Sequence, residues 1–149
     1  MKEHVSLGSS DAQLAIQVIG SELAKRGEAA VIAVADDHGE LIGLLRLDRA
    51  PLPSVAIATN KAFTAARERK TTFELGQKSR DPKTGFDFAF YGDPRYIGFG
   101  GGVPVIFDGA VVGAIAVSGL SSEEDAELAA IGVATVLEAN GRESGSTGS

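Results

Sequence analysis

One segment of the sequence carries side chains that could bind or transform an acid. Lys61, Thr64 and Arg67 follow one another at intervals of three residues, so Lys61 and Thr64 fall close together on one face of a helix. A lysine held among apolar neighbours could take part in proton transfer, and an arginine could bind a carboxylate. In the alternative interpretation, Lys61 lies at the surface and its stem covers apolar side chains.

Two further arginines and one carboxylate extend this set. Arg46 either pairs with the nearby Asp48 or binds a ligand carboxylate in the forked geometry of a guanidinium. Asp125 falls in the first turn of a predicted helix, where the helix dipole accounts for it, and as a general base it would need a raised pKa. The candidate catalytic residues are therefore Lys61, Arg46 and Asp125. The candidate ligand-binding side chains are those of Thr64, Arg67, Arg95, Tyr96 and Ser118.

Glycines supply the remaining candidates. Gly100, Gly101 and Gly102 precede a predicted strand, where they either expose N–H groups to an anion or form a tight turn into that strand. Ser118 and Gly119 precede the last predicted helix, whose N-terminus carries partial positive charge. These glycines join the candidate ligand-binding set, although a capped turn would explain the second stretch without a ligand.

Metal and cofactor ligands are scarce. The chain has two histidines, one methionine and no cysteine, which excludes disulfides, thiolate sites and a cysteine nucleophile. His38 follows two aspartates in a predicted turn, but side chains at a hairpin tip rarely converge, so we predict no metal site. The sequence also lacks the GxSxG, HExxH and strand-linked GxGxxG motifs of standard hydrolases and nicotinamide enzymes.

The composition indicates one globular domain. The chain has 149 residues, of which 44% are hydrophobic and 23% charged. Its net charge of −6 would repel phosphate backbones, so no nucleic-acid partner is expected. The longest apolar run, residues 109–120, is too short to span a bilayer, and the N-terminal residues contain no apolar signal core. We therefore expect a cytoplasmic protein with no membrane partner.

Apolar periodicity and turn residues predict the elements that position the candidates. Ser10–Gln13 and Ser121–Glu124 have capping-box spacing, and Thr71 suits a helix start. Gly27 suits a helix end, and Gly39 suits a turn with positive φ. Strands are expected at residues 3–7, 30–35, 41–47, 103–107 and 111–117, and helices at 10–26, 54–70, 72–77 and 122–139. The predicted fold is α+β, with a five-stranded, mostly antiparallel sheet and helices packed on it. The domain spans residues 1–140, and residues 141–149 form a disordered tail.

The segment over residues 78–99 is irregular and aromatic. The chain has seven Phe and two Tyr residues, and six of these nine lie in this segment. A loop this long and aromatic is more often functional or interfacial than not. The alternative is a loop that folds its aromatic side chains onto its own core.

Four stretches together resemble the GlcG/HbpS family, which also occurs as a domain of PduO-type proteins. They are VADDHGELIGLLRLDRAPLPS, ATNKAFTAAR, GFGGGVPVIFDGAVVGAIAVSG and SSEEDAELA, and they span roughly residues 30–132. The resemblance implies a five-stranded α/β sandwich, frequent homo-oligomers, and binding or degradation of haem. Other members are linked to corrinoid metabolism or to the breakdown of glycolate and aromatic compounds, so the fold does not fix the chemistry.

The chain departs from this family where haem ligands are expected. Many relatives carry a histidine after the turn glycine of the first hairpin, where this chain has Glu40, and the first predicted helix has no histidine. Haem would therefore be held by Tyr91, Tyr96 or another oxygen donor. The first hypothesis is a small-ligand-binding protein for haem or a related tetrapyrrole. The second is an enzyme that hydrolyses or isomerises a small anionic metabolite, such as a dicarboxylate from aromatic ring cleavage. The third is a structural homo-oligomer with a vestigial pocket.

Overall fold

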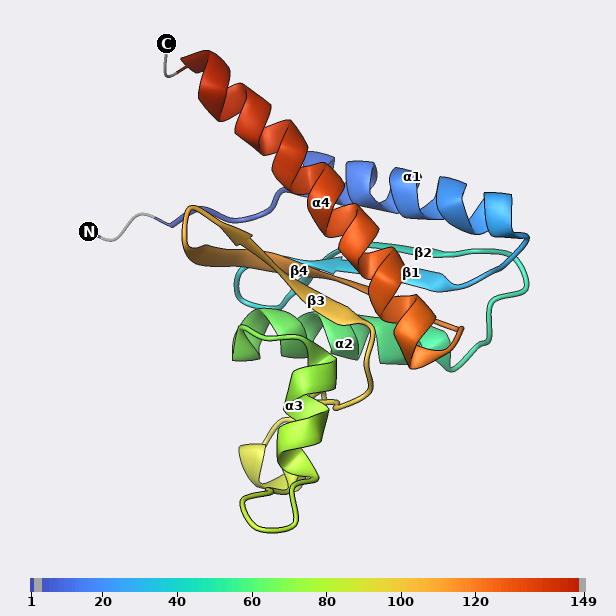
Figure 1. Cartoon of the computed structure of the whole chain (residues 1–149), viewed down its shortest axis with the longest axis vertical. Helices are drawn as coiled ribbons and strands as arrows, with labels where there is room; N and C mark the ends of the chain where they lie inside the picture. The colour runs from blue at the N-terminus through green and yellow to red at the C-terminus, as the bar shows by residue number, and fades with distance from the viewer. Residues whose placement is uncertain (2–3, 148–149) are drawn as a thin grey trace.

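Four antiparallel strands form the sheet in a computed structural model that describes residues 1 and 4–147 and side chains as far as Gly141. The strand order is β2-β1-β4-β3. Helices α1 and α4 cover one face of the sheet and α2 packs on the other, while α3 projects away from the sheet (Figure 1). The strands are β1 (Val31–Ala35), β2 (Leu41–Arg46), β3 (Gly102–Phe107) and β4 (Ala110–Ser118). The helices are α1 (Ser9–Arg26), α2 (Ser54–Glu68), α3 (Thr72–Ser79), the 3-10 helix η1 (Phe88–Tyr91) and α4 (Ser122–Thr147).

The prediction of a fifth strand at residues 3–7 is wrong. Residues 4–7 are not part of the sheet, and position 3 lies outside the described residues. Only the Leu7 N–H reaches β4, donating to the Val112 carbonyl at 2.9 Å. Strand β1 already pairs with this edge of β4 as far as Ala35, which lies opposite Ala114. The N-terminal segment therefore meets β4 only beyond the end of β1, where there is room for one hydrogen bond before α1 begins.

Helix α1 begins with a different cap from the predicted one. Gly8 is the N-cap residue, and its N–H donates to Oδ2 of Asp11 at 2.8 Å, so the predicted Ser10–Gln13 capping box does not form. The C-terminal end is as predicted, because Gly27 adopts the left-handed conformation with φ of 65°. A carboxylate in the first turn also favours the start of the helix through the helix dipole.

Small side chains bring α2 close to the sheet. The face of the sheet toward α2 is lined by alanines of β1 and β4, and α2 presents alanines in return. These residues are Ala33, Ala35, Ala114 and Ala116 in the strands and Ala58, Ala62, Ala65 and Ala66 in the helix. The opposite face buries larger side chains against α1 and α4, among them Ile32, Val34, Ile115 and Val117. The larger hydrophobic core therefore lies on the α1–α4 side, and the α2 side is a thin layer that polar groups of α2 can cross.

The last helix begins as predicted and extends further. Ser121 Oγ accepts a hydrogen bond from the Glu124 N–H at 3.1 Å, which confirms the predicted cap. Helix α4 passes the predicted end at 139 and continues to Thr147. Positions 148 and 149 lie outside the described residues, and a disordered tail over 141–149 stays a prediction. No helix in the described part of the chain is both long and apolar enough to cross a membrane.

The irregular aromatic segment forms a lobe with α3 on the α2 side of the sheet (Figure 1). Thr71 caps α3 as predicted, because its side chain accepts a hydrogen bond from the Glu74 N–H. The only regular structure in the next twenty residues of the described chain is the single turn η1. We call residues 86–99 the aromatic segment.

Candidate functional site

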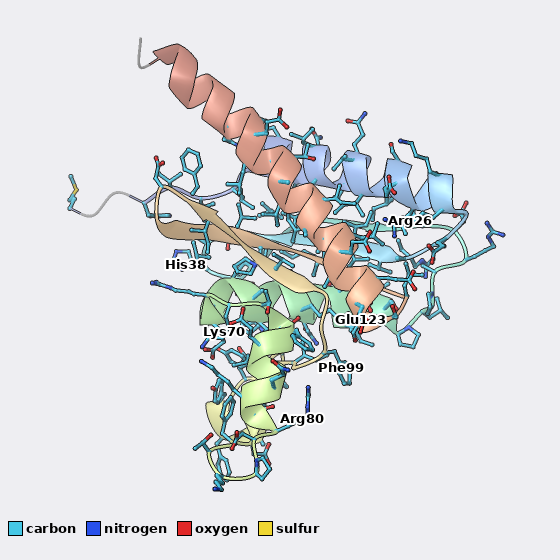
Figure 2. The ribbon with its side chains drawn as sticks, in the orientation of Figure 1. Arg26, His38, Lys70, Arg80, Phe99 and Glu123 are labelled. Carbon is cyan, nitrogen blue, oxygen red and sulfur yellow. The ribbon has the colours of Figure 1, made fainter. Side chains whose placement is uncertain are left out.

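Helix α2 carries the predicted site residues in two separate groups. Lys61 lies in a buried contact with the start of α4, whereas Arg67, about 1.7 turns further along, lies among exposed charges. His38, beside Arg67, and Glu123, at the start of α4, lie near opposite ends of α2 (Figure 2). The sequence predicts one site, and the structure divides its residues between a buried junction and an exposed cluster.

The buried junction joins Lys61 to Asp125. Both residues are 2% exposed, and Nζ of Lys61 lies 3.2 Å from Oδ2 of Asp125. The same Nζ donates to the Val117 carbonyl at 3.0 Å, and Oδ1 of Asp125 accepts from the Leu120 N–H at 3.0 Å. Burial lowers the pKa of Lys61 and raises the pKa of Asp125, while their mutual attraction opposes both shifts. The pair therefore links the middle of α2, the end of β4 and the first turn of α4.

The three consecutive glycines pack against this junction. Gly101 has φ of 131°, and a Cβ at this position would lie 2.6 Å from Nζ of Lys61. A Cβ on Gly102 would lie 2.6 Å from the Lys61 carbonyl oxygen, and the Gly102 N–H donates to Oγ1 of Thr72 at 2.9 Å. A Cβ on Gly100 would lie 3.3 Å from that of Ser122. These contacts favour the tight-turn interpretation, because the glycines make room for neighbouring chain.

Ser118, Gly119 and Arg46 lie at the same end of the sheet as the junction. The register pairs Val31 with Arg46 on one side and with Ser118 on the other. Arg46, Val31 and Ser118 therefore form one row across strands β2, β1 and β4. Ser118 is buried, whereas Arg46 is exposed and forms no ion pair with Asp48 within the described chain. Two strand spacings, roughly 10 Å, separate the Arg46 and Ser118 backbones. The alternative interpretation of Arg46, an ion pair with Asp48, is therefore not seen among the described residues, and Arg46 stays available to an anion.

Thr64 attaches the aromatic segment to α2. Its hydroxyl donates to the Arg95 carbonyl at 3.3 Å and accepts from the Ile97 N–H at 3.1 Å. Thr64 is fully buried. Its side chain therefore fixes the position of the segment that carries Arg95 and Tyr96.

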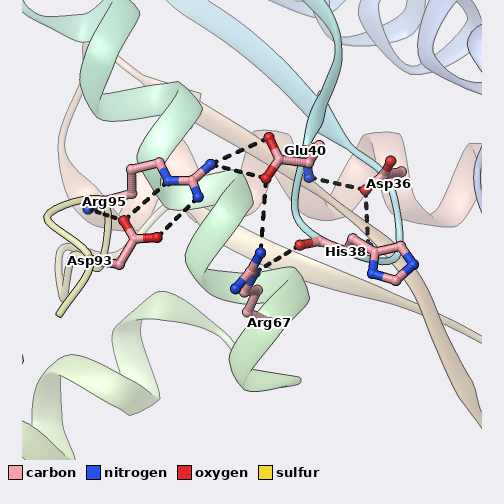
Figure 3. Close-up of polar contacts among 6 residues, drawn as sticks. All are labelled: Asp36, His38, Glu40, Arg67, Asp93 and Arg95. Atoms are coloured by element: carbon pink, nitrogen blue, oxygen red, sulfur yellow. Dashed lines mark hydrogen bonds and ion pairs between the residues drawn. The ribbon is translucent and has the colours of Figure 1, made fainter. Parts of the chain in front are cut away.

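Four charged side chains form what we call the arginine cluster: Glu40, Arg67, Asp93 and Arg95 (Figure 3). The Arg95 guanidinium lies 3.1 Å from Oε1 of Glu40 and 3.0 Å from Oδ2 of Asp93. The Arg67 guanidinium lies 3.9 Å from Oε1 of Glu40, and its Nε donates to the His38 carbonyl at 2.8 Å. Hydrogen bonds from Arg95 lower the pKa of Asp93. Hydrogen bonds to Asp93 and Glu40 raise the pKa of Arg95. Two cations and two carboxylates thus balance one another at the surface.

The arginine cluster lies against a series of aromatic rings. The Arg95 and Arg67 guanidinium carbons lie 3.8 and 4.8 Å from the centre of the Phe63 ring. Tyr96 packs edge-on against Phe63 at 5.2 Å, and Tyr91 packs edge-on against Tyr96 at 4.7 Å. Desolvation raises the pKa of Tyr91. The series therefore runs from the buried side of α2 out to the surface of the aromatic segment.

The outer part of the aromatic segment is open to solvent. Phe90 is 89% exposed and Phe99 is 58% exposed. The same segment also forms a surface cavity of about 490 Å³. It is lined by Phe88, Ala89, Gly92, Asp93, Pro94 and Tyr96. The loop therefore does not bury all of its aromatic side chains in the core, which favours its functional or interfacial interpretation.

Three of the residues that organise this region were not predicted from the sequence. Glu40 entered only as the residue replacing a histidine, and Asp93 and Phe63 were not selected at all. The Asp-x-Arg spacing of Asp93 and Arg95 was a usable signal, because an aspartate commonly accepts a hydrogen bond from the N–H two residues on, as it does here at 3.0 Å. Glu40 carried no such signal, since its contact with Arg95 joins positions 55 residues apart.

Comparison with known proteins identifies the relatives of this chain. Residues 7–134 match the family described as haem degrading protein HbpS-like. GlcG of Escherichia coli K12 is 36% identical over 118 residues, which cover 79% of this chain and 85% of GlcG. The corrinoid adenosyltransferase PduO of Salmonella typhimurium is 28% identical over 106 residues, which cover 71% of this chain but 32% of PduO.

Solved structures share the fold. Klebsiella pneumoniae ORFY superposes with a TM-score of 0.85 at 28% identity, covering 91% of this chain and 94% of ORFY. A complex of PduOC with haem gives a TM-score of 0.80 at 26% identity, covering 88% of this chain and 95% of PduOC. HbpS gives a TM-score of 0.80 at 30% identity, covering 90% of this chain and 92% of HbpS.

Proposed function

The chain belongs to the HbpS-like family, and on that premise we propose that it binds haem or a related tetrapyrrole on the aromatic segment. Family membership rests on the match over residues 7–134. PduOC, which has a similar fold, has been crystallised as a complex with haem. Fold alone does not assign a ligand, so the proposal depends on what the surface of this chain offers.

The observation that carries the proposal is an open aromatic surface beside two guanidiniums. A tetrapyrrole is a flat apolar ring with carboxylate side chains. Phe88 and Tyr96 line a cavity of about 490 Å³, and the exposed Phe90 follows Ala89 of that lining, so these rings offer apolar area to the tetrapyrrole. Arg95 and Arg67 lie next to that surface and suit the carboxylates. Both features come from segments that Thr64 and the arginine cluster hold in place.

The iron of haem would take an oxygen ligand from this surface. Tyr96 lines the cavity, and the Tyr91 ring packs against the Tyr96 ring with 4.7 Å between their centres. A tyrosine phenolate is an established axial ligand of haem iron. Neither of the two histidines lines this cavity, since His4 lies in the N-terminal segment and His38 in the β1–β2 turn.

Glu40 limits the affinity for anions. Its carboxylate lies 3.1 Å from Arg95 and 3.9 Å from Arg67, so both cations already face a negative charge. Asp93 already occupies Nε and Nη2 of Arg95, so a ligand carboxylate must displace Glu40 to reach Nη1. We therefore expect the wild-type chain to bind through ring contacts chiefly, with a smaller contribution from the carboxylates.

Titration of the purified protein with haemin tests the proposal. We expect a saturable, sharpened Soret band at one haem per chain. Phe90→Ala should weaken binding by roughly tenfold, since it removes an exposed aromatic contact worth about 1–2 kcal/mol. The matched control is Leu52→Ala, which removes an apolar side chain of 72% exposure outside the aromatic segment. An unsaturable response, or equal affinity of Phe90→Ala and wild type, would contradict the proposal.

A second candidate is an enzyme acting on a small dicarboxylate, and the Lys61–Asp125 pair favours it. Burial moves both pKa values toward neutrality, as in many catalytic pairs. It ranks second because Nζ of Lys61 already contacts Asp125 and the Val117 carbonyl. Neither Lys61 nor Asp125 lines the cavity of the aromatic segment or three other surface cavities of the described chain. Incubation with cis,cis-muconate, followed by proton NMR, tests it. Product that forms with wild type and is lost in Lys61→Ala and Arg46→Ala would support the enzyme.

Assembly and location complete the proposal. We propose a homo-oligomer in the cytoplasm, in which exposed aromatic side chains such as Phe99 contribute to contacts between copies. Multi-angle light scattering of the purified chain measures the assembly. A strictly monomeric mass would exclude a binding site shared between subunits.

A further inference from the structure

The two histidines of the chain meet at a single carboxylate. Nε2 of His4 lies 3.6 Å from Oδ2 of Asp37, and Nε2 of His38 lies 3.7 Å from the same oxygen. The ligand atoms of all three residues lie within 4.8 Å of one another. His4 comes from the N-terminal segment and the other two from the β1–β2 turn, so the hairpin alone does not supply the three ligands.

These separations suit a shared metal ion better than direct hydrogen bonds. A nitrogen–oxygen hydrogen bond is about 2.9 Å long, and both distances are well beyond that value. Around a tetrahedral ion with bonds of about 2.0–2.1 Å, neighbouring ligand atoms lie about 3.3 Å apart. Small rotations of the side chains of His4, Asp37 and His38 would therefore place one ion in contact with all three.

The backbone that presents these side chains is held from several directions. Oδ1 of Asp36 accepts from the His38 N–H at 2.9 Å and from the Glu40 N–H at 3.0 Å (Figure 3). The Arg67 side chain donates to the His38 carbonyl at 2.8 Å. The Asp37 N–H donates to Oγ of Ser6 at 3.1 Å, which ties the turn to the segment that carries His4. A site on a fixed backbone loses less entropy when an ion binds.

The three side chains leave open coordination positions. The imidazoles of His4 and His38 are 64% and 70% exposed, so their nitrogens are accessible. A surface depression of about 660 Å³ lies beside them, lined among others by His4, Asp37 and Arg69. Arg69 brings a positive charge to the same depression. A ligand that completes the coordination sphere there would be water or a small anion.

We propose that His4, Asp37 and His38 form a binding site for a divalent transition-metal ion of the zinc type. Imidazole nitrogens prefer zinc, nickel and copper, whereas magnesium and calcium prefer sites made of oxygen ligands alone. Two nitrogens and one carboxylate oxygen therefore select the first group. Bound metal would also clamp the N-terminal segment to the β1–β2 turn.

Zinc binding to the tag-free protein tests the site by competition with a chromogenic chelator. We expect one zinc ion per chain, no competition from a hundredfold excess of magnesium, and a higher melting temperature with zinc. His4→Ala, His38→Ala and Asp37→Asn should each lower the zinc affinity by roughly tenfold or more. The matched control is Asp48→Asn, which neutralises an exposed aspartate at the other end of β2 and should bind zinc like wild type.

Two outcomes would overturn the proposal. If the zinc affinity is unchanged in His38→Ala, the ion is bound by His4 and other groups near the N-terminus, and His38 is not a ligand. Absence of stoichiometric zinc binding to wild type would show that the three side chains do not form a site. Circular dichroism of each variant separates loss of the site from loss of the fold. We expect the same variants to bind haemin like wild type, since the metal site and the aromatic segment are separate.

Discussion

Replacing Lys61 with methionine should reveal how much the buried junction contributes to stability. Methionine fills a similar volume but leaves the Asp125 carboxylate buried without its counter-ion. Oδ1 of Asp125 would keep the Leu120 N–H, whereas Oδ2 would lose the ammonium 3.2 Å away. Removing one partner of a buried ion pair costs about 3–5 kcal/mol, so the free energy of unfolding should fall by that amount at pH 7.

Two features distinguish this effect from ordinary loss of packing. Without Lys61, the pKa of Asp125 in the folded state should rise further, because desolvation already raises it and the attraction that opposed this is gone. An acid with a raised folded-state pKa favours the folded state at low pH and loses that contribution as pH rises, so the cost should shrink on acidification. Adding Asp125→Asn should restore at least about 1 kcal/mol, because no buried charge remains.

Urea unfolding followed by circular dichroism measures these free energies. Lys25→Met on the exposed surface of α1 is the matched control and should change stability by less than about 0.5 kcal/mol. A cost below about 1 kcal/mol for Lys61→Met would refute the reasoning. So would a double variant less stable than either single variant, since it would mean that the two residues contribute independently.

Three other substitutions test separate parts of the account. Gly101→Ala should lower the unfolding free energy by about 2–4 kcal/mol in the same urea assay, because φ is 131° and a Cβ would lie 2.6 Å from the Lys61 ammonium. The control is Gly20→Ala, whose added Cβ has no atom within 4 Å, and it should raise the unfolding free energy by about 0.5–1 kcal/mol. Glu40→Gln should strengthen haemin binding by several-fold in the Soret titration, because it removes the carboxylate that faces both Arg67 and Arg95. An affinity equal to wild type would exclude these guanidiniums as carboxylate partners. Arg95 lowers the pKa of Asp93, so this contribution to stability is complete above the ordinary aspartate value of 3.8 and is lost as pH falls through the lower folded-state value. Near-ultraviolet circular dichroism of the tyrosines should therefore change between pH 4 and pH 2, and Asp93→Asn should flatten that change.

Local sequence signals predicted most elements of the fold. Caps at Thr71 and Ser121, the turn glycines Gly27 and Gly39, and two hairpins all appear where short-range patterns place them. The fifth strand failed because pairing with β4 depends on a distant edge that β1 already occupies. Alternating or apolar residues near the N-terminus cannot reveal that competition.

The candidate site divided for a similar reason. Lys61, Thr64 and Arg67 are neighbours along α2, and their spacing suggested one site. What each side chain contacts is set by segments far along the chain: Lys61 meets Asp125, 64 positions away, and Thr64 meets Arg95, 31 positions away. The convergence of His4 with His38 also joins positions 34 residues apart and has no local signal.

The most direct test of the central claim is to locate the tetrapyrrole on the protein. Amide chemical shifts of the labelled chain would be recorded during titration with zinc protoporphyrin, whose diamagnetic metal leaves the signals sharp. We expect the large shifts to fall in residues 86–99 and around Glu40 and Arg67. Large shifts confined to α1 and α4, on the opposite face of the sheet, would contradict it.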